Sequence, residues 1–72
     1  MPAQNKITVF ANGKACQIDG SSTIGSLAAS FKLEPKMVLI EFNGQALLRN
    51  EWEAKPLTHG DRIEFIRVVA GG

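Results

Sequence analysis

The sequence predicts an α+β fold in which a mixed sheet of four to five strands carries one main helix on one of its faces. Two Asn-Gly dipeptides, Asn12-Gly13 and Asn43-Gly44, each follow a run of β-branched or apolar residues, and this dipeptide is the strongest short hairpin signal. Between them the spacing of apolar residues changes from the period of a strand to that of a helix. A hairpin followed by a crossing helix and more strands indicates one mixed sheet.

The first hairpin joins two predicted strands, Lys6–Ala11 and Lys14–Asp19. In the second strand Cys16 and Ile18 share one face, because residues two apart in a strand point the same way. The run Asp19-Gly20-Ser21-Ser22 then ends the hairpin.

A helix is predicted from Thr23, and either Thr23 or Ser22 can cap its first amide groups. Gly25 lowers the stability of this helix by about 1 kcal/mol. The helix must end before Glu34, since the residue preceding Pro35 is pushed out of the helical region. Its apolar stripe has the i, i+3, i+4, i+7 spacing of an amphipathic helix and consists of Ile24, Leu27, Ala28 and Phe31.

The second half of the chain is predicted to supply the remaining strands. These are Met37–Phe42, a short return over Gln45–Leu48 and a last strand over Arg62–Val69. A helical turn is expected at Arg49–Glu53 and a polar turn at Leu57–Asp61.

The length of 72 residues predicts a single domain over residues 1–72, with a flexible tail at 70–72. A chain of this size buries only about 60% of the surface that its unfolded form exposes. It can build one core and little more, which argues against an enzyme with an enclosed pocket.

Charge and cysteine content exclude several classes of protein. Eight basic residues are scattered among seven acidic ones, for a net charge of +1, so no basic footprint for nucleic acid is visible. No run of apolar residues is long enough for a membrane span or a signal peptide, and a cytoplasmic location is expected. Cys16 has no second cysteine with which to form a disulfide or a zinc cluster, and no metal site is predicted.

Three residues could have a functional role, but for each of them a structural role is favoured. His59 lies in a turn beside Gly60 with no evident nucleophile to activate, so turn chemistry is favoured over a general base. Cys16, in phase with Ile18, is typical of a small buried hydrophobic residue rather than a nucleophile or sulfur acceptor. Trp52 is expected to close the edge of the core, the alternative being a partner anchor. No catalytic residue is predicted.

The parity of the strands places apolar residues on the face that points away from the helix. Ile63 and Phe65 share the inward phase of the last strand, and the other phase is not polar. The residues of the outward phase predict an exposed apolar patch that docks a partner, formed by Phe10, Met37, Leu39, Ile66 and Val68. The alternatives are an inverted face assignment or a loop that covers the patch.

The sequence ends on Ala70-Gly71-Gly72, and two glycines at this place arise by chance in about one chain in a hundred. Without Cβ atoms, Gly71 and Gly72 can pass through a narrow channel and approach a reacting group closely. The chemistry available to such an end is that of its carboxylate, which is unreactive until a leaving group is attached.

Several segments together carry a resemblance to a known family. They are the hairpin around Asn12-Gly13, the helix from Thr23, Arg49-Asn50-Glu51-Trp52, Leu57-Thr58-His59-Gly60-Asp61 followed by Ile63, and Ala70-Gly71-Gly72. Over essentially its whole length the chain resembles the ubiquitin-like sulfur carriers, most closely the ThiS family of thiamin (thiazole) biosynthesis. His59 departs from that family, which often has an acidic or polar residue at this turn.

The resemblance implies a ubiquitin-like β-grasp fold and a protein cosubstrate, not an enzyme. An E1-like adenylating enzyme would activate the Gly72 carboxylate with ATP, and this chain itself would bind no cofactor. Sulfur from a cysteine desulfurase or another donor would then give a thiocarboxylate, which thiazole synthase consumes. Gly71 and Ala70 would thread the tail into these partners. No nucleic acid or membrane partner is expected, and the free chain is expected to be monomeric.

Three other functions stay open at this point. The first is another carrier function, either for a different sulfur-containing product or as the small subunit of molybdopterin synthase. That subunit is similar in fold and tail, but it usually carries prolines where this chain has Ile66-Arg67-Val68-Val69. A protein modifier would use the same activated Gly72, attacked by a lysine amine to form an isopeptide. A plain interaction domain would have its terminal glycines by coincidence.

Overall fold

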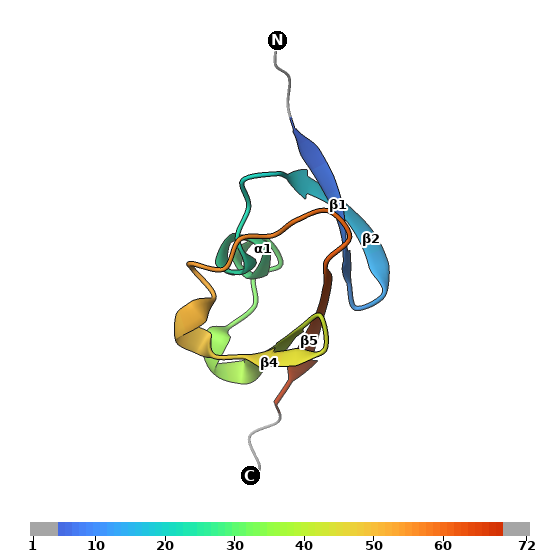
Figure 1. The fold of residues 1–72 in the computed structure, drawn as a ribbon. Helices are drawn as coiled ribbons and strands as arrows, with labels where there is room; N and C mark the ends of the chain where they lie inside the picture. The colour runs from blue at the N-terminus through green and yellow to red at the C-terminus, as the bar shows by residue number, and fades with distance from the viewer. Residues whose placement is uncertain (1–4, 69–72) are drawn as a thin grey trace.

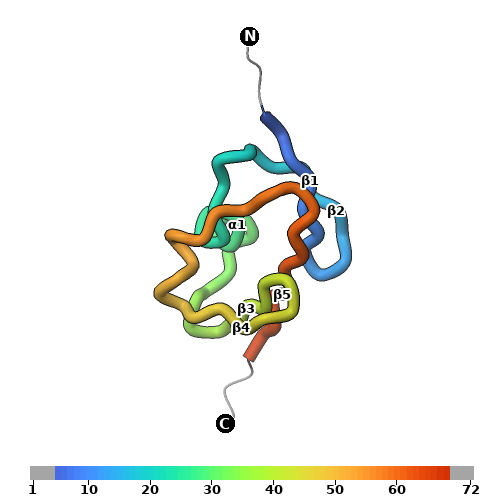
Figure 2. Tube along the Cα trace, viewed as in Figure 1, coloured from blue at the N-terminus to red at the C-terminus, as the bar shows by residue number. Residues whose placement is uncertain are grey.

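The computed structural model describes residues 5–68 (Figure 1). In chain order the elements are β1 (Lys6–Ala11), β2 (Lys14–Asp19), α1 (Ile24–Ser30), the 3₁₀ helix η1 (Pro35–Met37), β3 (Val38–Phe42), β4 (Gln45–Leu47), the 3₁₀ helix η2 (Arg49–Glu51) and β5 (Arg62–Arg67). The β1–β2 hairpin lies on one side of β5, and β3 with β4 lies on the other (Figure 2).

The strands form one sheet in the order β2-β1-β5-β3-β4. β1 and β5 at the centre run parallel, whereas the other neighbouring strands are antiparallel. The predicted mixed sheet with one main helix is therefore confirmed. Because β5 pairs with both β1 and β3, this last strand joins the two hairpins into a single sheet.

Both hairpins close through the predicted Asn-Gly turns. The φ angles are 50° and 84° at Asn12 and Gly13, and 50° and 86° at Asn43 and Gly44. Positive φ at both central residues is the geometry of a type I′ turn, whose twist matches that of the strands it joins. The two turns thus form for the local reason that the sequence indicates.

The asparagine side chains of these turns also hold β5 in place. Asn12 Oδ1 accepts the Phe65 N–H at 2.6 Å, and Asn12 Nδ2 donates to the Phe65 carbonyl at 3.3 Å. From the other side Asn43 Oδ1 accepts the Arg62 N–H at 2.8 Å, and Asn43 Nδ2 donates to Asp61 Oδ1 at 3.1 Å. β5 is therefore bonded to both hairpin turns as well as to its neighbouring strands.

Helix α1 begins with a reciprocal cap. Thr23 Oγ1 accepts the Ser26 N–H at 3.1 Å, and Ser26 Oγ accepts the Thr23 N–H at 2.9 Å. Of the two predicted caps, Thr23 is the one that the structure uses. Each bond satisfies an amide hydrogen that would otherwise lack a partner at the helix start.

The apolar stripe of α1 is buried over its first three residues, but not at its end. Phe31 is the C-cap and remains 43% exposed, with its ring edge-on to Phe65 at a centroid distance of 5.6 Å. Lys32, at φ 57°, takes the chain out of the helix directly afterwards. Phe31 therefore lies on the predicted apolar stripe and contacts the sheet, but it is only partly covered because the chain leaves the helix directly after it.

The ends of three predicted strands differ from the structure. Met37 belongs to η1, where Pro35 at the first position has the φ that a helical turn requires. Leu48 and Val68 follow β4 and β5 directly without belonging to them. Val69 lies outside the described residues.

The hydrophobic core lies between α1 and the inward face of the sheet. Trp52, which follows η2, is 4% exposed and belongs to this core, so its predicted role of closing the core edge is confirmed. Its carbonyl accepts the Gly25 N–H at 2.8 Å, which ties the segment after η2 to the first turn of α1. The buried core cluster consists of Val9, Ile24, Leu27, Ala28, Val38, Ile40, Trp52, Leu57 and Ile63.

Among residues 5–68, no helix is both long enough and apolar enough to span a lipid bilayer.

Candidate functional site

Large apolar side chains are exposed on the face of the sheet that points away from α1. Their exposed fractions range from 38% to 65%, whereas the inward residues on the same strands belong to the core. We refer to this set as the outer-face patch, which consists of Met37, Leu39, Leu48, Ile66 and Val68.

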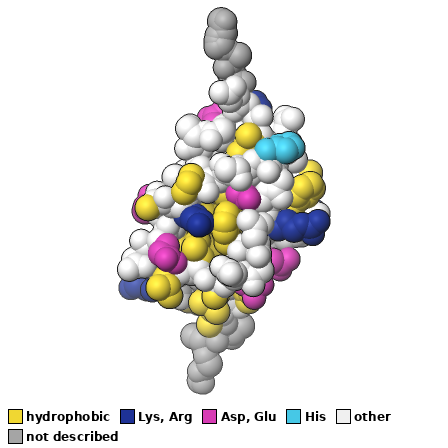
Figure 3. Space-filling view, viewed as in Figure 1, with side chains coloured by type: hydrophobic (Ala, Val, Ile, Leu, Met, Phe, Trp, Pro, Cys, Tyr) yellow, Lys and Arg dark blue, Asp and Glu magenta, His cyan; other side chains and the backbone are white. Residues whose placement is uncertain are grey.

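Strand pairing brings the members of the outer-face patch together. Leu39 and Ile66 are directly opposite each other in the β3–β5 register. One position further on, the Val68 N–H donates to the Met37 carbonyl at 2.8 Å. Leu48 follows β4 in the position opposite Leu39, because Leu47 pairs with Ile40. Figure 3 shows hydrophobic side chains gathered at the end of the molecule where β5 ends.

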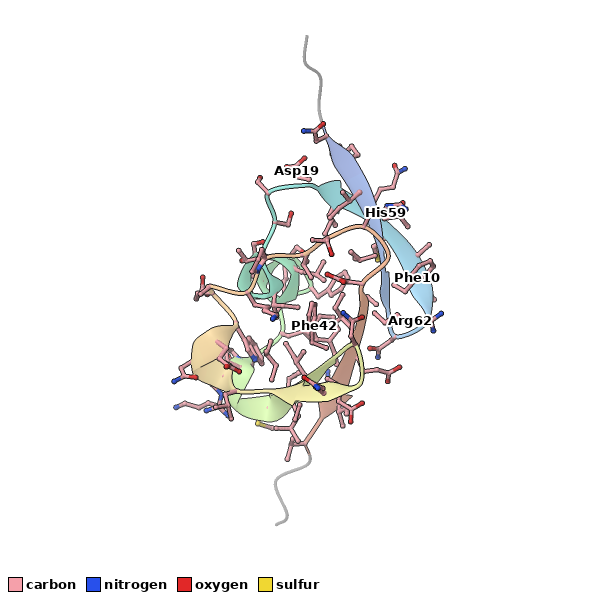
Figure 4. All side chains as sticks on the ribbon, viewed as in Figure 1. Phe10, Asp19, Phe42, His59 and Arg62 are labelled. Atoms are coloured by element: carbon pink, nitrogen blue, oxygen red, sulfur yellow. The ribbon has the colours of Figure 1, made fainter. Side chains whose placement is uncertain are left out.

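Phe10 shares the outward phase but lies apart from the outer-face patch. It is half-buried, pairs with Arg62, and has the Arg62 guanidinium carbon 5.9 Å from its ring centroid (Figure 4). Ile66 lies four residues further along β5, or about 13 Å at the rise of a strand. Strand parity gives the face on which Phe10 lies but not its distance from the patch along β5.

Two carboxylates separate Phe10 from the outer-face patch. Glu41 and Glu64 are directly opposite each other in the β3–β5 register, and both are exposed. Like charges at such a position destabilise a sheet by a few tenths of a kcal/mol up to about 1 kcal/mol. The patch therefore has a negatively charged border on the side of Phe10.

The predicted reactive end, Ala70, Gly71 and Gly72, lies outside the described residues. Val68, the last described residue, is a member of the outer-face patch. The chain thus leaves the described domain directly from this patch.

His59 has a structural role in the turn before β5. Its Nδ1 accepts the Thr8 N–H at 3.1 Å, while the adjacent Gly60 has φ 91° and donates its N–H to the Thr8 carbonyl at 2.7 Å. The interpretation of His59 as turn chemistry is confirmed by these bonds, which tie the turn to β1.

Cys16 is half-buried on β2, packs against the core, and donates from Sγ to the Lys14 carbonyl at 3.7 Å. It also lines a cleft of about 470 Å³ on the α1 side of the sheet. The concave surface is therefore larger than the length of the chain predicts. The cleft is open, since lining residues such as Lys14 are exposed.

In the described part of the chain, no three His, Cys, Asp or Glu side chains gather in a way that would hold a metal ion.

Comparison with family models matches residues 7–72 to the ThiS family. The chain belongs to the ThiS family.

Solved structures agree with this assignment. The crystal structure of the thiamine biosynthesis protein ThiS from Geobacter metallireducens superimposes with a TM-score of 0.78 at 29% identity, covering 92% of this chain and 100% of that chain. The ubiquitin of Caldiarchaeum subterraneum, at 22% identity, has a TM-score of 0.53 over 97% of this chain and 100% of its own, which shows a shared fold. The fold is therefore the ubiquitin-like β-grasp that the resemblance implied.

A curated relative of this ThiS family chain is the uncharacterized protein ycf40 of Trieres chinensis. It is 25% identical over 65 residues, which cover 90% of this chain and 89% of the relative.

The segment from Leu57 to Ile63, which contributes to the resemblance to the ThiS family, has a structural role. Leu57 and Ile63 are buried core residues, and Gly60 has the positive φ that its turn requires. Asp61 Oδ2 accepts the Thr58 N–H at 2.8 Å, which closes that turn. In this chain these residues therefore build the turn before β5 and place that strand.

Leu48 is a member of the patch that the sequence reasoning missed. A two-residue turn at Asn43-Gly44 pairs Phe42 with Gln45, and counting outward places Leu48 opposite Leu39. The signal was therefore present in the sequence, in the register of the second hairpin.

Proposed function

We propose that this ThiS family chain carries sulfur on the carboxylate of Gly72 for the thiazole moiety of thiamin. The observation that carries the proposal is the outer-face patch, which includes the last described residue, Val68. Membership of the ThiS family and the likeness to a thiamine biosynthesis protein support a carrier that works with partner enzymes. The match to the family model extends to residue 72 and so includes the proposed site.

The apolar area of the patch offsets much of the entropic cost of ordering the tail in a partner. Val68 and Gly72 are four residues apart, so the proposed reactive carboxylate lies within about 14 Å of the patch. Ordering residues 69–72 costs on the order of 4–8 kcal/mol in backbone entropy. Covering the exposed half of five large apolar side chains contributes roughly 4–7 kcal/mol. Docking and tail ordering thus nearly balance, which permits release after each transfer.

The proposed chemistry proceeds in two substitutions at the terminal carboxyl group. An E1-like enzyme with ATP joins a carboxylate oxygen of Gly72 to AMP, and pyrophosphate leaves. Sulfide, released from the persulfide of a desulfurase by a thiol reductant or supplied by another donor, then displaces AMP from the acyl carbon and leaves a thiocarboxylate. This chain contributes the carboxylate and the docking surface, while catalysis, ATP binding and delivery to thiazole synthase belong to the partners.

Intact-mass measurement tests this proposal. The full chain, incubated with the adenylating enzyme, ATP and a sulfur source, should gain the mass difference between one sulfur and one oxygen. The change should depend on ATP and should be absent from a chain shortened by Gly72. Conjugates to lysine side chains would instead indicate a protein modifier, and no ATP-dependent change would indicate an interaction domain.

A further inference from the structure

A cleft of about 470 Å³ lies on the face of the sheet that carries α1, beside the end of that helix. Its volume is within the range of about 300–1,000 Å³ that is usual for ligand sites. Most of its lining is apolar, from Ala11, Cys16, Phe31, Leu33, Val38 and Phe65, and the other lining residues are Asn12, Lys14 and Arg67.

The cleft borders an edge strand. β2 is the outermost strand on its side of the sheet, and Lys14 and Cys16 of β2 line the cleft. Edge strands present backbone N–H and C=O groups that can pair with another chain.

The ladder between β1 and β2 shows which of these groups are free to pair. The Gly20 N–H donates to the Asn5 carbonyl at 2.7 Å, and bonded pairs alternate with non-bonded pairs along an antiparallel ladder. The residue pairs Val9–Cys16 and Ala11–Lys14 are therefore bonded across the ladder. The backbone groups of Ala15 and Gln17 consequently point away from β1, toward the open edge.

A strand added at this edge would place every second side chain on the cleft side of the sheet. Lys14 and Arg67 are the charged residues among those that line the cleft, and both are cations. A strand with apolar side chains at alternate positions and a carboxylate in the same phase would match both the apolar lining and the positive charge of the cleft.

We propose that β2 and the adjacent cleft bind an extended, acidic peptide segment of a partner protein. The segment adds as a strand to β2, its alternate apolar side chains enter the cleft, and a carboxylate faces Lys14. This site lies on the opposite face of the sheet from the outer-face patch, so both surfaces can be occupied at once. The proposal does not depend on sulfur transfer.

Amide NMR titration of the full chain tests the proposal with a synthetic peptide, acetyl-Glu-Thr-Phe-Thr-Phe-Thr-Glu-amide. In this peptide the two Phe and two Glu side chains share one phase of a strand. We expect saturable shifts at Ala15, Gln17, Phe31 and Leu33. Replacing both Glu residues of the peptide by Lys should weaken binding by about tenfold or more, because this change removes one good charge contact. Replacing the central Thr by Pro removes a strand donor and should weaken binding similarly.

Variants of this chain distinguish binding at this site from the general effect of a changed charge. Lys14→Glu should reverse the preference between the Glu and Lys peptides, and Cys16→Phe should reduce binding by filling the cleft. The control Lys6→Glu makes the same charge change on the other end of the hairpin and should leave the preference unchanged. Removal of residues 69–72 should leave binding unchanged as well, which distinguishes this site from the proposed carrier function.

Three results would overturn the proposal. The first is the absence of saturable shifts, and the second is shifts confined to the outer-face patch. The third is equal affinity for the Glu peptide, the Lys peptide and phenylacetate, because the cleft would then accept a small apolar group without strand pairing or charge recognition.

Discussion

Leu39→Glu is the most direct test of the outer-face patch. Leu39 is 55% exposed, lies directly opposite Ile66 and has Leu48 on its other side. Because the side chain is outside the core, the free energy of unfolding should change by no more than about 0.5 kcal/mol. The substitution therefore perturbs the surface while it keeps the fold.

The expected loss of affinity follows from two contributions. Covering the exposed part of a leucine side chain is worth about 1–2 kcal/mol, which the variant loses. Enclosing a carboxylate that finds no partner costs about 1–3 kcal/mol more. At 1.4 kcal/mol for each tenfold change, the variant should bind the adenylating enzyme at least about 25-fold more weakly.

Calorimetric titration of the adenylating enzyme with each variant measures this loss, and urea unfolding checks the stability of the variant. Ala29→Glu is the matched control, since Ala29 is exposed on α1, away from the face of the sheet that carries the patch. The control should bind within twofold of the parent chain. An affinity of the folded Leu39→Glu variant within twofold of the parent would refute the assignment of the patch as a docking surface.

Three further changes test the forces within the fold, each by urea unfolding. Trp52→Ala should lower the free energy of unfolding by about 3–5 kcal/mol, because it empties a core position; a loss under 1 kcal/mol would contradict its place in the core. Glu64→Lys should raise it by about 0.2–1 kcal/mol by pairing with Glu41, with a gain that shrinks as salt is added; a salt-independent change would count against this reason. His59→Ala should lower it by roughly 0.5–1.5 kcal/mol through loss of the bond from Thr8, and no change would show that water replaces that bond.

The fold was predictable from the sequence because its signals are local. The Asn-Gly turns at 12–13 and 43–44 have the positive φ angles that this dipeptide favours, and the cap at Thr23 lies where the apolar spacing changes. Strands β1 and β2 have the predicted bounds for the same reason. Local signals were sufficient to predict the turns, the helix cap and these strand bounds, because residues close in sequence determine their conformation.

The features that escaped prediction depend on distance between elements. Parity assigned Phe10 and Ile66 to one face, but only strand pairing shows that Phe10 lies beside Arg62. The exposure of Phe31 follows from the place where α1 ends, and the adjacent cleft is lined by residues from the end of α1 and from several strands that are far apart in the sequence. Three-dimensional spacing of this kind is not encoded in a short window of sequence.

β5 connects the two proposed binding surfaces, and its register keeps them distinct. Phe65 and Arg67 line the cleft, whereas Ile66 and Val68 belong to the outer-face patch, so alternate residues of one strand serve opposite faces. A slip of one residue would exchange the two sets and bury the wrong side chains. The side chains of the two turn asparagines bond the backbone of β5 at Arg62 and at Phe65, which opposes such a slip at both places. The turn chemistry that made the fold predictable therefore also determines which residues reach each partner.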